Sequence, residues 1–139
     1  MFYTNARIFV NNEFHVGAFE VVDGKFGAIL PENVPADAID LGGATVIPGL
    51  VDIHTHGAMG EDFSDGKADK LQMMADYYAA HGVTSVLATT MTLKEETLTP
   101  AMEVIRDFKR PADGAKAIGF HLEHNELQTY SSQLVNWYM

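Results

Sequence analysis

The 139-residue sequence contains no cysteine, which limits the chemistry available to it. Disulfide bonds and thiolate metal sites are excluded, so any bound metal ion must be held by histidine, aspartate or glutamate. Basic residues are also scarce, because nine lysines and arginines accompany nineteen aspartates and glutamates, giving a formal net charge of -10. Nucleic acids and anionic membranes bind basic surfaces, so we expect neither as a partner.

Long apolar runs are missing as well. No stretch approaches the roughly 20 residues of a membrane span. The N-terminus, MFYTNARIFVNNEF, has no basic start followed by an apolar segment, so we predict no secretory signal and a cytoplasmic location. The hydrophobic fraction of 47 % is sufficient for a real core, and the length is that of about one domain.

Residues 1–46 carry short β-forming segments separated by turn signals. The segments ARIFV (6–10) and AFEVV (18–22) are rich in β-branched and aromatic residues. Asn11-Asn12 and Asp23-Gly24 are typical of tight turns between strands. We therefore predict a small β-rich unit over residues 1–46, with no helix between residues 6 and 30.

From Val46 onward the pattern changes to alternating strands and helices. Strands are predicted near 48–55, 84–90 and 116–122, and helices over 65–82 and 93–110. This β-α-β-α-β order over residues 47–123 predicts parallel strands joined by right-handed crossovers. Thr92 and Glu95 suit a capping box for the second helix, and Pro100 predicts a kink or a new helix start within it.

Two histidines end the first of these strands in the sequence VDIHTH. Residues two apart on a strand share a face, so we expect Asp52, His54 and His56 on one face, and likewise His121 and Glu123. Sites in parallel sheets gather at the C-terminal strand ends. Imidazole nitrogen and carboxylate oxygen are suitable ligands for a divalent metal such as zinc. We predict that His54, His56 and Glu123 converge on a metal ion, with Gly57 letting the backbone turn away.

Other interpretations of these polar residues remain open. The His pair could be structural, hydrogen-bonded to Thr55 or Asp52. We expect structural roles for His15 and His81 and assign none to His124. The cluster at residues 89–92 (TTMT) could line a site, although we prefer capping of the next helix. The acidic segment at residues 60–66 (GEDFSDG) could hold a cation, although we prefer a solvated loop.

Several segments together resemble one enzyme family. VIPGLVDIHTHG is similar to the first barrel strand of the amidohydrolase superfamily. With AFEVVDGKFGAI, HGAMGEDFSDG, AAHGVTSVLATTMT and IGFHLE, residues 1–123 resemble N-acetylglucosamine-6-phosphate deacetylases. HLE on the third strand distinguishes this family from relatives such as dihydroorotase, which use a carboxylated lysine.

The resemblance implies a fold, a reaction and a ligand set. The fold is an α/β one, a (β/α)8 barrel with about three strands in this chain, preceded by a small β-sandwich-like unit. The reaction is hydrolysis of N-acetylglucosamine 6-phosphate to glucosamine 6-phosphate and acetate. Glu123 matches the principal metal ligand, and His54 and His56 match the pair that binds a second ion. One or two divalent ions, zinc or iron, and a homo-oligomer are expected.

The chain also departs from the family. The family continues HLE with Gly-Pro-Phe, whereas His124-Asn125-Glu126 follow Glu123 here, and residues 124–139 are atypical. The family's later histidines, catalytic aspartate and phosphate-binding groups have no counterpart, so we expect a truncated chain that is inactive alone. The alternatives are another amidohydrolase acting on a cyclic amide or ureide, or a non-catalytic metal-binding or interaction fragment.

Overall fold

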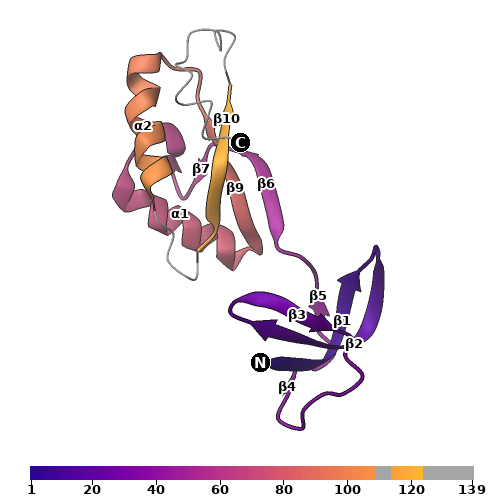
Figure 1. The fold of residues 1–139 in the computed structure, drawn as a ribbon. Coiled ribbons are helices and arrows are strands. Elements are labelled where there is room, and N and C mark those ends of the chain that lie inside the picture. Colours follow the sequence, from indigo (N-terminus) through magenta and orange to yellow (C-terminus); the bar gives the residue numbers. More distant parts are fainter. Residues whose placement is uncertain (109–113, 124–139) are drawn as a thin grey trace. The chain divides into compact units, whose positions relative to one another are not determined.

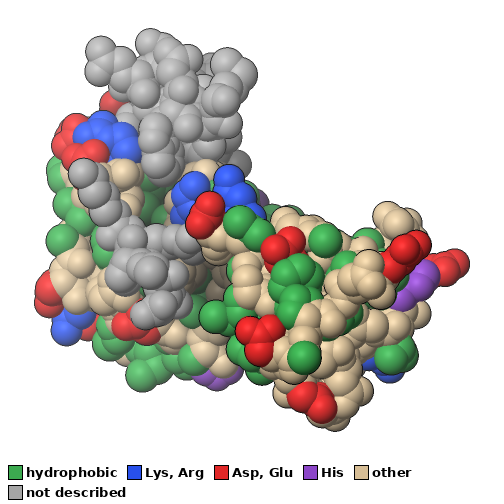
Figure 2. Space-filling view, turned by 60° about the horizontal axis from the view of Figure 1, so that its bottom comes forward, with side chains coloured by type: hydrophobic (Ala, Val, Ile, Leu, Met, Phe, Trp, Pro, Cys, Tyr) green, Lys and Arg blue, Asp and Glu red, His purple; other side chains and the backbone are tan. Residues whose placement is uncertain are grey.

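The computed structural model describes residues 1–108 and 114–123, and it divides the chain into two units, Met1–Pro48 and Gly49–Met139 (Figure 1). The atypical segment 124–139, and with it His124, lies outside the described residues. None of the helices described is long and apolar enough to span a membrane. Apolar side chains lie among the charged ones on the face shown in Figure 2.

The N-terminal unit is one five-stranded sheet. Its strands are β1 (Phe2–Val10), β2 (Glu13–Val22), β3 (Lys25–Ile29), β4 (Ile39–Asp40) and β5 (Thr45–Val46). The order is β3-β2-β1-β4, with β5 also paired to β1; β1, β2 and β3 are antiparallel, and β4 and β5 run parallel to β1. A small core of Ala6, Ile8 and Phe19 is buried in it. Residues 1–48 are all described and contain no helix, as predicted.

Both predicted turns are confirmed. Asn11 and Asn12 have φ of 52° and 65°, and Asp23 and Gly24 have φ of 50° and 73°. Two successive left-handed residues match the right-handed twist of the flanking strands, which is why Asn-Asn and Asp-Gly serve in two-residue hairpins.

The C-terminal unit is a three-stranded parallel sheet with two helices. The main elements are β6 (Leu50–Thr55), α1 (Ala68–Ala80), β9 (Val83–Thr90), α2 (Glu95–Asp107) and β10 (Lys116–Leu122). Both strand pairs of this sheet are parallel, in the order β10-β9-β6, which confirms the predicted parallel β-α-β-α-β order. A hairpin of β7 (Gly57–Ala58) and β8 (Glu61–Asp62) and a short 3-10 helix, η1 (Phe63–Asp65), lie between β6 and α1.

The helices cover one face of this sheet (Figure 1). Their apolar residues pack on the central strand, where Val86 and Ala88 are buried. The buried helical residues are Leu71, Met74 and Tyr78 from α1 and Leu98, Met102 and Ile105 from α2. Ile53 and Ile118 remain 64 % and 46 % exposed on the flanking strands. The helices therefore seal one side of the sheet and leave strand residues on β6 and β10 accessible to solvent.

The predicted capping box of α2 is wrong, and no new helix begins at Pro100. The N-cap is Lys94, with no side-chain capping hydrogen bond, and the Thr92 hydroxyl instead donates to the backbone carbonyl of Glu123 at 2.9 Å. The helix also continues through Pro100 without a break. Pro100 lies in the second turn on the exposed side, so its missing N–H affects the carbonyl of Glu96, which is itself on an exposed residue.

Candidate metal centre

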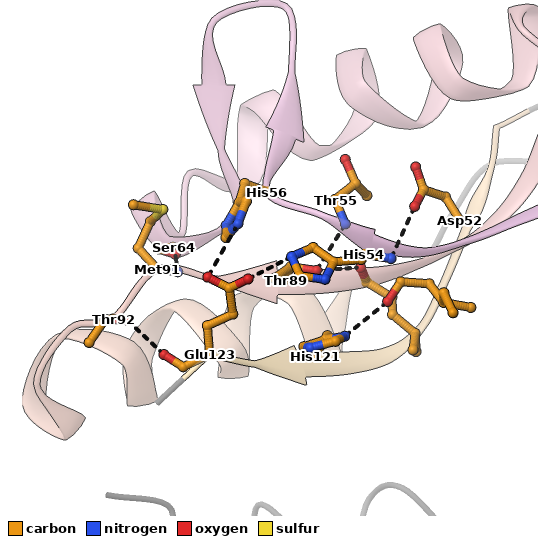
Figure 3. A network of polar contacts seen from close by, with 12 residues as sticks. Asp52, His54, Thr55, His56, Ser64, Thr89, Met91, Thr92, His121 and Glu123 are labelled. Carbon is orange, nitrogen blue, oxygen red and sulfur yellow. Dashed lines mark hydrogen bonds and ion pairs between the residues drawn. The ribbon is translucent and has the colours of Figure 1, made fainter. Parts of the chain in front are cut away.

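The three predicted ligands meet at the C-terminal edge of the parallel sheet. His54 belongs to β6, His56 follows that strand, and Glu123 follows β10. The Nε2 atom of His54 lies 2.6 Å from Oε1 of Glu123, and Nε2 of His56 lies 3.6 Å from Oε2. One ligand atom from each residue falls within 4.8 Å of the others. Figure 3 shows both imidazoles directed at the carboxylate.

This donor set fits a divalent metal ion. Two neutral imidazole nitrogens and one carboxylate oxygen are a common partial ligand set for zinc and for iron. The Nδ1 atom of His56 is buried and has no hydrogen-bond partner within the described residues. The side chains of His54 and Glu123 are 48 % and 37 % exposed, so an ion and a small ligand can reach them from solvent.

The structural alternative for the histidine pair required hydrogen bonds from Thr55 or Asp52 to the rings. Both side chains are used elsewhere. Asp52 accepts from the backbone N–H of His54 at 3.0 Å, and the Thr55 hydroxyl contacts Tyr78 and the carbonyl of Gly57. The rings therefore face the carboxylate rather than these groups.

The prediction that Asp52 shares a face with His54 is wrong. Asp52 pairs with Val86 and Thr55 pairs with Ala88, so three steps on β6 correspond to two on β9. This irregularity is a β-bulge, in which one extra residue shifts the alternation of side chains. Figure 3 shows Asp52 and Thr55 on the opposite side of β6 from His54. The bulge directs the imidazole toward Glu123 and turns Asp52 away.

His121 lies beside the three candidate ligands without joining them. Its ring centroid is 4.4 Å from that of His54, and its Nδ1 lies 3.0 Å from the carbonyl oxygen of Ile53. A carbonyl only accepts hydrogen bonds, so Nδ1 carries the proton and the ring is oriented by this contact. His15 lies in β2 and His81 follows α1, where its Nδ1 contacts the carbonyl of Tyr77 at 2.7 Å.

The threonine cluster supports the strand ends rather than capping α2. Thr89 and Thr90 are buried at the end of β9. The Thr89 hydroxyl accepts from the backbone N–H of Thr55 at 2.9 Å, and the Thr92 hydroxyl donates to the carbonyl of Glu123. Hydroxyls from β9 and its following turn thus fix the backbone next to ligands from both neighbouring strands. Polar residues at the end of a central strand were the only sequence signal for this role.

The acidic segment 60–66 is not a solvated loop. Phe63 and Ser64 are buried, and Asp62 accepts from the backbone N–H of Ser64 at 2.7 Å, which starts η1. Glu61 pairs with Lys67 at 2.8 Å, and this contact lowers the pKa of the Glu61 carboxyl below its usual range. The carboxylates of this segment therefore already have partners in the protein.

Comparison with known proteins gives relatives for most of the chain, although no protein-family model matches it. N-acetylglucosamine-6-phosphate deacetylase of Vibrio furnissii is 35 % identical over 120 residues, which are 86 % of this chain and 28 % of the relative. N-acetylgalactosamine-6-phosphate deacetylase of Escherichia coli O157:H7 is 32 % identical over 104 residues, 74 % of this chain and 27 % of the relative.

A solved structure agrees with these sequence matches. The crystal structure of N-acetyl-D-glucosamine-6-phosphate deacetylase from Mycobacterium smegmatis superposes with a TM-score of 0.75 at 30 % identity. The superposition covers 89 % of this chain and 32 % of that chain. The chain therefore spans about a third or less of the length of these relatives.

Proposed function

We propose that this chain is the N-terminal portion of an N-acetylglucosamine-6-phosphate deacetylase of the amidohydrolase superfamily, and that it supplies the metal centre for hydrolysis of the N-acetyl group of N-acetylglucosamine 6-phosphate. The products are glucosamine 6-phosphate and acetate. The observation that carries the proposal is the convergence of His54, His56 and Glu123 within 4.8 Å, in the part of the chain that resembles the deacetylases.

Each ligand has a distinct task in this proposal. A divalent metal ion supplies Lewis acidity for attack of water on an amide. The Glu123 carboxylate lies between the two imidazoles, so its negative charge would stabilise a cation that the imidazoles bind. His54 and His56 offer neutral nitrogens from one short segment, while Glu123 comes from a different strand. Zinc or iron fits this donor set, with one or two ions per site.

The proposed architecture follows from the same geometry. Three parallel strands with helices on one face are the arrangement of the first strands of a (β/α)8 barrel, whose sites lie at the C-terminal strand ends. The N-terminal sheet is then half of a β-sandwich. A phosphorylated sugar is charged and does not cross a bilayer unaided, so we place the reaction in the cytoplasm. We also propose that the protein forms a homo-oligomer.

A second substrate is supported by one of the relatives. The Escherichia coli O157:H7 protein is named for N-acetylgalactosamine 6-phosphate, and it matches 74 % of this chain. The two sugars carry the same acetamide and the same phosphate and differ in the orientation of one hydroxyl. The same metal centre can therefore serve either compound, and the two must be assayed side by side.

The test has a binding part and a catalytic part. Equilibrium dialysis of the purified chain with zinc should show binding that Glu123→Gln weakens; absence of binding would refute the metal centre. Residues 1–123 would then replace the matching segment of the Vibrio furnissii enzyme, and acetate release from both sugars would be measured. A folded, metal-loaded chimera that releases acetate from neither sugar would favour the non-catalytic metal-binding fragment, and turnover of a cyclic amide would favour the other amidohydrolases.

A further inference from the structure

A tyrosine from α1 contacts the backbone immediately after the histidine motif. Tyr78 is 6 % exposed, and its ring packs in the helix-covered core. Its hydroxyl donates to the carbonyl oxygen of Gly57 at 2.7 Å and lies 2.7 Å from the hydroxyl of Thr55. This contact joins the helical layer to the turn that carries the candidate ligands, from the side opposite the metal centre.

The proton count on these hydroxyls sets the direction of each bond. A tyrosine hydroxyl has one proton, and a carbonyl oxygen can only accept, so Tyr78 donates to Gly57. The Thr55 hydroxyl then has its proton for the Tyr78 oxygen at 2.7 Å, a shorter contact than its 3.4 Å to the Gly57 carbonyl. Burial raises the pKa of Tyr78, so the hydroxyl keeps its proton at neutral pH.

The two contacted residues alternate with the two imidazoles. In the order His54, Thr55, His56, Gly57, the ligands come first and third and the Tyr78 contacts second and fourth. The backbone N–H of Thr55 is also fixed by Thr89 at 2.9 Å. The two residues that flank His56, Thr55 and Gly57, are thus held from outside the metal centre, although the Nδ1 atom of the His56 ring has no described partner.

We propose that Tyr78 is a positioning residue, whose hydroxyl holds the turn so that the imidazoles of His54 and His56 converge on Glu123. This inference rests on the proposed metal centre but concerns a group that touches neither the ion nor the substrate. The ring of Tyr78 has a separate packing role, stacked beside Phe63 at a centroid distance of 6.5 Å. Tyr78→Phe keeps that ring and removes only the hydroxyl, so it separates positioning from packing.

The experiment is a cobalt titration of the full chain, followed by absorption spectroscopy, with Tyr77→Phe as the matched control. Tyr77 is the neighbouring residue and is 39 % exposed. Residues that orient metal ligands typically contribute about 10- to 100-fold in affinity, so Tyr78→Phe should weaken cobalt binding by about tenfold. It should also change the ligand-field spectrum, whereas Tyr77→Phe should match the wild type in both readouts.

The outcomes separate this inference from the metal centre itself. Wild-type chain that binds no cobalt would refute the metal centre and the inference together. Wild-type binding with an unchanged Tyr78→Phe affinity and spectrum would overturn the inference alone. Thr55→Val removes the other hydroxyl and provides a second variant if Tyr78→Phe does not fold. Thr55→Val should weaken cobalt binding similarly. If Tyr78→Phe does not fold, unchanged cobalt binding by Thr55→Val would overturn the inference as well.

Discussion

Replacement of Gly57 by alanine tests whether the turn after the histidine motif is as tightly constrained as the structure indicates. Gly57 has φ of 152°, a region that residues with a side chain rarely adopt. A Cβ atom there would lie 2.1 Å from the carbonyl oxygen of Glu61 and 3.0 Å from Cα of Asp62. Because these are backbone atoms, no side-chain rotation relieves the contact.

The magnitude follows from these distances. The Glu61 carbonyl would have to retreat by about 1.3 Å to restore the 3.4 Å of an ordinary contact. Overpacking of this kind costs about 1–3 kcal/mol, and an unfavourable φ adds about 1–3 kcal/mol. We therefore expect Gly57→Ala to lower the free energy of unfolding by about 3 kcal/mol. It should also weaken zinc binding, because the displaced Gly57 carbonyl accepts the Tyr78 hydrogen bond.

Gly60→Ala is the matched control within the same hairpin. Gly60 also has a positive φ, 81°, but a Cβ atom there would have no neighbour within 4 Å. Gly60→Ala should therefore lower the free energy of unfolding only by the cost of the unfavourable φ, about 1–2 kcal/mol, and should leave the zinc affinity unchanged. The assays are urea unfolding followed by circular dichroism, and zinc titration. Equal destabilisation by the two variants, or full zinc affinity in Gly57→Ala, would refute the reasoning.

Four further outcomes are expected. Glu123→Gln should lower zinc affinity at least about tenfold in a dialysis assay, because it removes the one carboxylate of the cluster. Thr92→Val should lower it less, since Thr92 holds only the Glu123 carbonyl. The Gly42 N–H and the Asn5 amide hold the pKa of Asp40 below its ordinary value, about 3.9. The resulting stabilisation is complete above that value and lost as pH falls through the folded pKa, so Asn5→Ala should raise the Asp40 pKa in an NMR titration. The 139-residue chain with zinc should release no acetate from N-acetylglucosamine 6-phosphate, because the one carboxylate of the described cluster is the proposed metal ligand and no second one remains to act as a base. Turnover that Glu123→Gln abolishes would contradict this prediction.

Periodicity and turn chemistry were sufficient to predict the longer strands and both α-helices, but not the β7-β8 hairpin or η1. The Asn11-Asn12 turn depends on two adjacent residues, and the burial of Leu71, Met74 and Tyr78 depends on spacing within one helix. Such local rules can be read from a single chain. They also placed His54 and Glu123 at strand ends, and parallel pairing then brings those ends to one edge of the sheet.

What could not be predicted depends on contacts between elements. The bulge in β6 is defined by how β6 pairs with β9, so the segment VDIHTH alone does not indicate that Asp52 points away from His54. Thr92 has the local sequence of a helix cap, but its hydroxyl donates a hydrogen bond to the nearby carbonyl of Glu123. The helical spacing of Tyr78 indicates that its ring is buried, but it does not indicate that its hydroxyl donates to the Gly57 carbonyl.

The order β10-β9-β6 has a consequence for the behaviour of the chain in solution. Within the residues described, β6 and β10 each have one strand neighbour, and these two outer strands carry or lead into all three candidate ligands. A second copy that extends the sheet at either edge would lie directly beside a ligand-bearing strand. Self-association and zinc occupancy would then be thermodynamically linked, each changing the other by the same factor. Apparent zinc affinities should therefore be measured at micromolar and at millimolar concentrations of the chain and compared before a single value is assigned to the monomer.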